Sequence, residues 1–142
     1  MRKPLLFLFT ALVLVACNES LEDRAEREAR EYTARYCPTP VMNNSRTDSV
    51  AFDKATKTYT YYCTLTGEYD SAEFIAKYGG ELNSRLAQTI ADDASIEKLK
   101  AAGFSFHFVI HSERAPEKVL YERTITAKEY DNPPKPTATP AF

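Results

Sequence analysis

The sequence predicts an α+β fold in which about four antiparallel strands, in two hairpins, carry two to three helices on one face. Two pairs of segments with alternating apolar and polar residues, each pair joined by a short connection, predict the hairpins. Segments with apolar residues three or four apart precede and separate these pairs, and they predict the helices. A chain of 142 residues is long enough for one domain with a single core.

The first expected helix covers residues 20–36. Ser20 is a favourable N-cap, and Asp23 stands where the acid of a capping box would be. Acidic residues in this first turn also complement the helix dipole. The apolar stripe of the helix is thin and consists of Leu21, Ala25, Tyr32 and Tyr36.

The first expected hairpin pairs residues 49–53 with residues 58–66. In its second strand, aromatic and aliphatic residues alternate with threonine, which is typical of a half-buried strand. Tyr59, Tyr61 and Cys63 share one face, which we expect to be the core face, and Tyr62 lies on the other.

The second expected helix begins at Asp70, with Glu73 completing a capping box. Gly79 and Gly80 predict a kink or a break within it. A short third helix is expected at residues 94–102, capped by the acidic pair Asp92–Asp93 and ended by Gly103. The stripe of the second helix consists of Phe74, Tyr78, Leu82, Leu86 and Ile90.

The second expected hairpin pairs residues 104–112 with residues 119–126. Its first strand places four large apolar residues on the core face and His107 and His111 on the other. These histidines lie about 13 Å apart along a strand, which is too far for one metal ion. The candidate binding surface consists of Tyr62, His107 and His111.

The first seventeen residues indicate export. Arg2 and Lys3 precede an apolar run that is too short to span a membrane, which needs about 20 residues, and this pattern is typical of a secretory signal. The run ends in Leu14-Val15-Ala16-Cys17. This motif resembles the lipobox of bacterial lipoproteins, in which the cysteine receives fatty acyl groups such as palmitate and becomes the new N-terminus.

The resemblance implies a signal peptide at residues 1–16, a single α+β domain at residues 17–130, and membrane lipid as a partner through acylated Cys17. Asn18 follows the cysteine. In enteric bacteria the lack of aspartate at this place implies the outer membrane rather than the inner one. Residues 131–142 contain four prolines and are expected to form an extended, flexible tail.

Two cysteines, Cys37 and Cys63, remain if Cys17 carries lipid. An even pair in an oxidising compartment predicts a disulfide. It would close a loop of about 27 residues and stabilise the fold by about 3–4 kcal/mol. Two free thiols are the alternative.

Composition and motifs argue against several classes of function. The net charge is −2, and removal of residues 1–16 leaves 16 basic against 20 acidic residues, which argues against nucleic acid as a partner. The sequence has neither a Gly-x-Ser-x-Gly motif nor a phosphate-binding glycine loop. We therefore expect no enzymatic activity, cofactor or metal, and a module that binds an unknown envelope protein.

Two other functions remain open. The chain could inhibit a cell-wall hydrolase by inserting a loop, either residues 43–46 or the turn near Arg114, into its cleft. It could also be a lipoprotein that binds a small ligand in a pocket under the helices.

Overall fold

The computed structural model describes residues 18–135. The predicted signal peptide, the lipobox with Cys17 and most of the predicted tail lie outside the described residues, so the structure does not bear on them.

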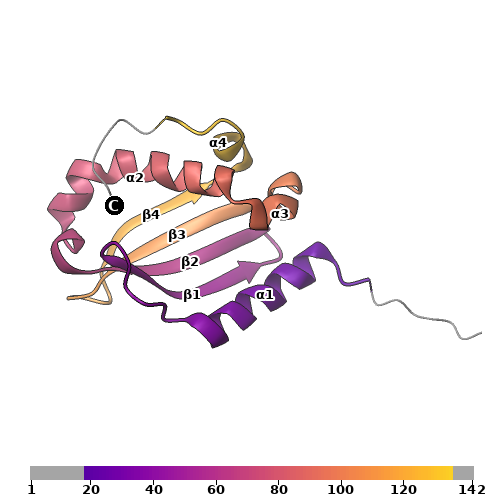
Figure 1. Cartoon of the computed structure of the whole chain (residues 1–142), viewed down its shortest axis with the longest axis horizontal. Coiled ribbons are helices and arrows are strands. Elements are labelled where there is room, and N and C mark those ends of the chain that lie inside the picture. The colour runs from indigo at the N-terminus through magenta and orange to yellow at the C-terminus, as the bar shows by residue number, and fades with distance from the viewer. Residues whose placement is uncertain (1–17, 136–142) are drawn as a thin grey trace, which may run out of the picture.

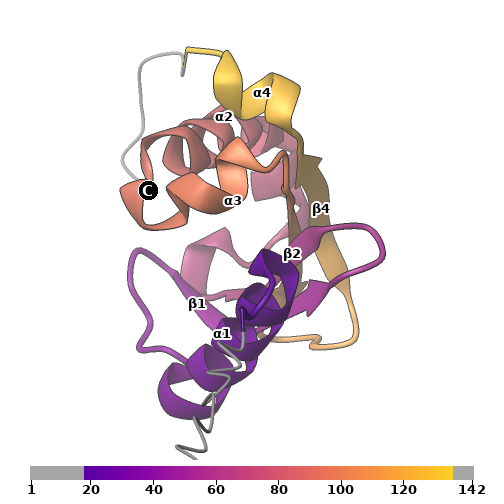
Figure 2. The ribbon, with the colours of Figure 1, turned by 90° about the vertical axis from the view of Figure 1, so that its right-hand side faces the viewer.

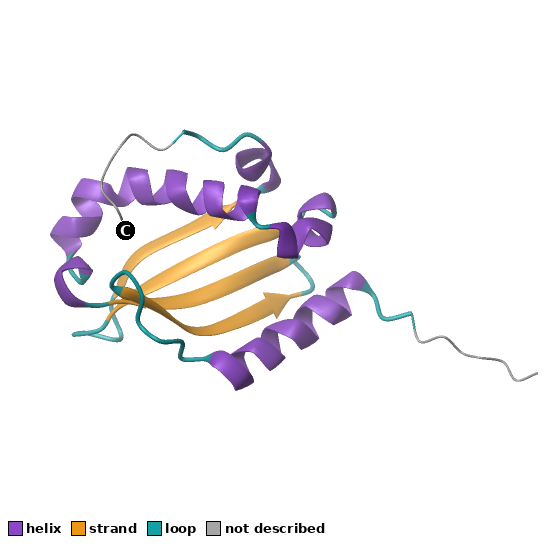
Figure 3. Cartoon of the chain, viewed as in Figure 1, coloured by secondary structure: helices purple, strands orange, loops and turns teal. Residues whose placement is uncertain are grey.

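The architecture is a four-stranded mixed sheet with helices packed against it, which confirms the predicted α+β class (Figures 1 and 3). The strands lie side by side in chain order, and β1–β2 and β3–β4 form the two predicted antiparallel hairpins. The strands are β1 (Ser45–Asp53), β2 (Thr58–Leu65), β3 (Ser105–Ser112) and β4 (Val119–Ile125).

The pairing of β2 with β3 differs from the prediction of antiparallel strands throughout. These strands are parallel, with Thr58 opposite Ser105 and Leu65 opposite Ser112. The connection between them contains a long helix that returns the chain to the end of the sheet where β2 began, and such a crossover produces parallel neighbours. The two hairpins are local features, whereas the pairing between them is set by this long connection.

The helical elements are α1 (Leu21–Tyr36), η1 (Gly67–Tyr69), α2 (Ala72–Asp92), η2 (Ala94–Ile96), α3 (Glu97–Ala101) and α4 (Ala127–Asp131). The first matches its prediction, and the Ser20 hydroxyl accepts a hydrogen bond from the Asp23 N–H. The pair Gly79–Gly80 does not break α2, which runs through both residues. The short α4 was not predicted, although a capping box between Thr126 and Glu129 begins it.

The N-cap of α2 is Ser71 and not Asp70 as predicted. The Ser71 hydroxyl accepts from the Phe74 N–H, while Asp70 turns inward. Its Oδ2 accepts a hydrogen bond of 2.9 Å from the Arg114 N–H, and its side chain is 1% exposed. Asp70 therefore ties the start of α2 to the β3–β4 connection.

The core lies between the helices and one face of the sheet. Phe104, Phe106 and Ile125 are fully buried, and Ala25, Ala87 and Ile90 contribute from α1 and α2. This burial confirms the predicted core face of β3. The face that carries Tyr62, His107 and His111 is the opposite one, because side chains alternate along a strand.

Helix α1 covers the edge of the sheet at β1 (Figures 1 and 2). The Thr33 hydroxyl donates to the Val50 carbonyl and accepts from the Val50 N–H, both at 2.9 Å. Beyond the helix, the Thr39 N–H donates to the Thr47 carbonyl, and the Thr39 hydroxyl accepts from the Thr47 N–H. Together these contacts satisfy backbone groups that an edge strand otherwise exposes.

The predicted disulfide is not formed in this structure, in which Cys37 and Cys63 are free thiols. Cys37 follows α1 outside the sheet edge, whereas Cys63 lies in β2, one strand further in. Thr47 of β1 stands opposite Cys63, and its hydroxyl oxygen lies 4.0 Å from the Cys63 sulfur. Cys37 also acts on the Cys63 thiol through its charge, but no bond joins the two sulfurs.

Candidate functional site

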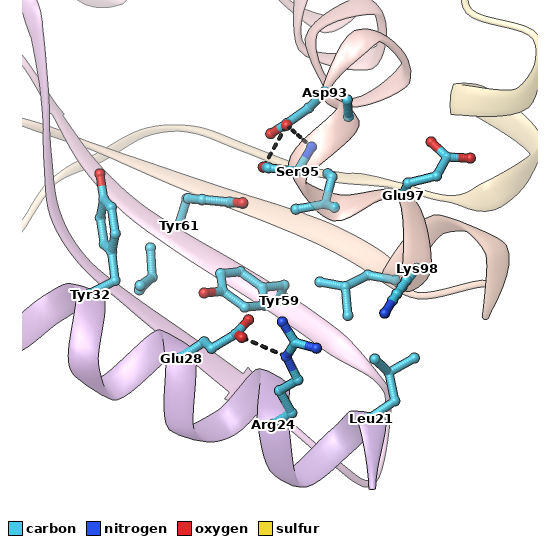
Figure 4. A pocket seen from close by; sticks show the side chains of 14 residues that line it. Leu21, Arg24, Glu28, Tyr32, Tyr59, Tyr61, Asp93, Ser95, Glu97 and Lys98 are labelled. Atoms are coloured by element: carbon cyan, nitrogen blue, oxygen red, sulfur yellow. Dashed lines mark hydrogen bonds and ion pairs between the residues drawn. The ribbon is translucent and has the colours of Figure 1, made fainter. Parts of the chain in front are cut away.

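A cleft of about 750 Å³ opens on the helical side of the sheet, between α1 and the junction of α2 with α3 (Figure 4). Strand β2 forms its floor. One wall is a single stripe of α1, and the other is the segment that leads from the end of α2 into α3. The residues that line the cleft include Leu21, Arg24, Glu28, Tyr32, Tyr59, Tyr61, Asp93, Ser95, Glu97 and Lys98.

The cleft follows from the placement of the helices. Helix α1 contacts β1 and α2 contacts β4, which are the two edges of the sheet. Three strand spacings separate these edges by about 14 Å. Two packed helices have axes only about 8–10 Å apart, so α1 and α2 do not close over the middle strands. The inner face of β2 is therefore left partly open.

The floor consists of Tyr59 and Tyr61, whose ring centroids are 5.3 Å apart. Tyr61 also stacks on Phe108 of the core at 5.0 Å, which fixes its ring. Burial, and secondarily the charge of Glu28, raises the pKa of Tyr59 to about 12. Burial raises the pKa of Tyr61 as well. Both hydroxyls are therefore protonated at neutral pH, and neither has a hydrogen-bond partner among residues 18–135.

The α1 wall presents an ion pair and an exposed aromatic ring. Arg24 Nε lies 2.7 Å from Glu28 Oε1, one helical turn away. Tyr32 is 40% exposed, and its ring lies 5.3 Å from that of Tyr36, which is exposed as well. Apolar surface thus continues out of the cleft along α1.

The opposite wall is held by a cap that the sequence predicted. Asp93 Oδ1 accepts hydrogen bonds from the N–H and the hydroxyl of Ser95, at 2.8 and 2.6 Å, so the acid caps η2 (Figure 4). Further along, Glu97 pairs with Lys100 at 3.2 Å. Lys98 is exposed and forms no ion pair within the described part of the chain.

The surface predicted from sequence lies on the other side of the sheet. The register places Tyr62 opposite Val109, between the positions of His107 and His111, so the three residues do share one face. Tyr62 is 37% exposed. His107 hydrogen-bonds Thr124 and Glu122, and His111 hydrogen-bonds the Pro116 carbonyl. Within residues 18–135, neither the cleft above β2 nor a smaller hollow beside α4 includes a residue of this face.

Both loops considered for an inhibitor are tied to the rest of the fold. Arg46 pairs with Asp48 at 2.8 Å, and the Asn44 carbonyl accepts from the Thr66 N–H. The Arg114 side chain donates to the Gly67 carbonyl at 2.9 Å. Neither loop projects as a free arm.

No group of three or more histidine, cysteine, aspartate or glutamate side chains within residues 18–135 is arranged to hold a metal ion. None of the helices in that range has the length and apolar character of a membrane span.

Sequence reasoning left a pocket under the helices open as an alternative but named none of its lining residues, although one signal for the cleft was present. The thin apolar stripe of α1 meant that this helix could not cover a sheet face by itself. Tyr59 and Tyr61 were correctly assigned to the core face, but the open space above them depends on where α1 and α2 lie, which no local pattern encodes.

Two solved structures share the fold. A predicted secreted protein from Pseudomonas aeruginosa has a TM-score of 0.65 with 11% identity, over 77% of this chain and 91% of that one. The pilotin EpsS of the Vibrio vulnificus type 2 secretion system has a TM-score of 0.60 with 17% identity, over 77% of this chain and 90% of that one. At such identities the likeness shows the fold alone.

No curated protein matches the sequence. A family model, described as a domain of unknown function (DUF8479), matches residues 20–121, from the cap of α1 into β4. This range covers most of the chain and every wall of the cleft. The chain therefore belongs to the DUF8479 family.

Proposed function

We propose that this protein is a non-catalytic, lipid-anchored module of the bacterial envelope, and that its cleft between α1 and α2–α3 binds a segment of another envelope protein. The observation that carries the proposal is the open aromatic floor of that cleft. Tyr59 and Tyr61 offer ring surface together with unpaired hydroxyls, and tyrosines of this kind are enriched at protein interfaces.

The size and shape of the cleft favour a peptide segment over a small molecule. It is partly open to solvent, and its rim carries charged side chains on both walls. Pockets for small ligands enclose most of the ligand surface. An open trough with an aromatic floor and a charged rim resembles the centre and edge of a protein interface instead.

The likeness to a pilotin supports the same class of function by analogy. That protein belongs to a secretion system of the cell envelope. Because folds host many functions, the analogy adds to the argument from the cleft and does not replace it. We therefore propose for this chain only the same general class of function, that of an accessory protein that binds another envelope component.

The proposed anchor is acylated Cys17. It precedes α1 by only three residues, so the domain would stand close to the outer membrane. Two or more acyl chains hold a protein stably on a bilayer, whereas a single chain binds reversibly.

Site-specific photocrosslinking tests the binding site. Tyr32 lies on the cleft rim and Tyr62 on the opposite sheet face, with exposures of 40% and 37%, so they form a matched pair. Each is replaced in turn by p-benzoylphenylalanine in the full-length protein, in cells that make it naturally. The proposal predicts one discrete crosslinked envelope protein from position 32 and none from position 62.

The reverse result, a discrete product from position 62 alone, would show that the face with His107 and His111 is the interface. Crosslinks of equal yield and pattern at both positions would show that neighbouring proteins are captured without a specific binding site, and would also overturn the proposal.

The anchor has its own test. The intact mass of membrane-extracted protein is expected to show cleavage before Cys17 plus added acyl mass, and Cys17→Ser is expected to leave the membrane fraction. An unmodified leader, or a Cys17→Ser protein that stays with membranes, would refute the anchor without affecting the cleft.

A further inference from the structure

We propose that the cleft selects a peptide segment whose charges have a fixed order: a basic residue at the Asp93 end, apolar or aromatic residues over Tyr59 and Tyr61, and an acidic residue at the Lys98 end. This inference rests on the proposed function and names the chemistry of its partner.

The first support is the free cation at one end. Figure 4 shows Lys98 on the side of the cleft where Leu21 and Arg24 lie. Arg24 is neutralised by Glu28 at 2.7 Å, whereas Lys98 has no carboxylate partner within residues 18–135. An unpaired ammonium on a cleft wall favours a carboxylate of a ligand.

The second support is the free anion at the other end. Asp93 lies on the Tyr61 side of the cleft (Figure 4). Its Oδ1 is engaged by Ser95, but no lysine or arginine in the described chain pairs with the carboxylate. Burial is the largest cause that raises the pKa of Tyr61, followed by the charges of Tyr59 and Asp93. The negative charge of Asp93 therefore acts on the floor of the cleft.

The end of α2 adds to the negative potential there. Asp93 is the C-cap of this 21-residue helix, and a helix carries partial negative charge at its C-terminus. Acid and helix end therefore act together on a basic group of the ligand.

The middle of the cleft has no unpaired charge. Glu28 is held by Arg24, and the floor between the two ends consists of the rings of Tyr59 and Tyr61. Aromatic rings favour apolar or aromatic side chains of the ligand. The order basic, apolar, acidic follows from this arrangement.

The length of the segment follows from α1. The wall extends from Leu21 to Tyr32, which corresponds to about 17 Å of helix. An extended segment needs about five residues to cover that distance, and a helical one needs about eleven. A random library of 12-residue peptides therefore contains both kinds.

The test is selection from such a displayed 12-residue library on the full purified protein. We expect enriched peptides with a basic and an acidic residue on opposite sides of an apolar block. Lys98→Glu is expected to weaken their binding about threefold or more, since an attraction becomes a repulsion. Asp93→Asn keeps the oxygen that caps η2, and it is expected to weaken binding through the basic residue only.

Lys118→Glu is the matched control, because this exposed lysine lies on the β3–β4 connection away from the cleft. It is expected to leave binding unchanged. Enriched peptides that Tyr61→Ala abolishes but that show no charge order, or are indifferent to Lys98→Glu, would overturn this inference and keep the proposed function. A library that yields no peptide sensitive to Tyr61→Ala would overturn both.

Discussion

At the scale of single residues, Asp70 shows how a buried charge can hold two distant segments together. Its carboxylate accepts from the Arg114 N–H, and the Arg114 side chain donates to the Gly67 carbonyl. Burial by itself raises the pKa of Asp70, but hydrogen bonds from Ser112 and Arg114 and the charge of Arg114 lower it further than burial raises it. The charged form is therefore the one that stabilises the fold.

Asp70→Asn is expected to lower the free energy of unfolding by about 1–3 kcal/mol, because the charged acceptor is lost in a buried place. Urea denaturation at neutral pH measures this. Asp131→Asn, at the exposed end of α4, is the control and is expected to change little. Equal stability of Asp70→Asn and wild type would contradict the role assigned to Asp70.

The same carboxylate makes stability depend on pH. Because its pKa is lower in the folded state than in the unfolded state, the contribution of Asp70 is present in full above the unfolded value of about 3.9. It is lost as the pH falls through the folded value. Denaturation between pH 6 and pH 2 is expected to show wild type losing more stability than Asp70→Asn. Parallel curves would contradict this.

The thiols respond to their surroundings in a way that alkylation can measure. Burial raises the pKa of Cys63 to about 11, so very little thiolate is present at neutral pH. Burial also raises the pKa of Cys37. Iodoacetamide is expected to modify Cys63 slowly in the folded protein, and both thiols rapidly in urea without reductant. Failure to label in urea would mean that the thiols are oxidised, contrary to the structure.

At the scale of elements, α1 is placed by polar contacts more than by an apolar face. Only Ala25 and Ala29 are buried along it. Thr33 takes the place of a neighbouring strand for Val50 at the sheet edge. Lys54 of the β1–β2 turn reaches Asp23 and Glu26 of the helix at 2.8 and 2.7 Å. A helix fixed at the edge in this way leaves the sheet face beside it open.

Thr33→Val keeps the shape of the side chain and removes both hydrogen bonds to Val50. It is expected to lower the free energy of unfolding by about 1–2 kcal/mol and to promote association through the uncovered edge. Chemical denaturation and light scattering measure these effects. Thr60→Val, on the outer face of β2, is the isosteric control. If both variants behave alike, Thr33 does not protect the edge.

Most elements could be predicted from the sequence because their signals are local. Ser20 caps α1, Asp93 caps η2, and Gly103 takes a positive φ of 73° after α3, all as their residue types indicate. Asp70 was mistaken for a cap because Ser71 beside it suits that position equally well, and only the distant Arg114 draws Asp70 inward. The parallel pairing of β2 and β3 also depends on long-range packing.

At the scale of the whole molecule, some parts of the functional prediction likewise rest on local signals, and others depend on how distant segments pack. The predicted location in the cell envelope rests on the residues before α1. Lipidation at the Leu-Val-Ala-Cys motif remains a prediction. The surface predicted at Tyr62, His107 and His111 lies on a correctly predicted face, but both histidines are half-buried. The cleft required knowledge of how α1, β2 and α2 lie in space, and so it emerged only with the fold.

The central claim is that the cleft above Tyr59 and Tyr61 is where the partner binds, and filling it is the most direct test. Ala94 lines the cleft and Ala51 lies on the opposite sheet face, and both are exposed. The measurement is the amount of the envelope protein crosslinked from position 32 that copurifies with Ala94→Trp and with Ala51→Trp, at matched thermal stability. The account predicts loss with Ala94→Trp and wild-type yield with Ala51→Trp, and the opposite result would contradict it.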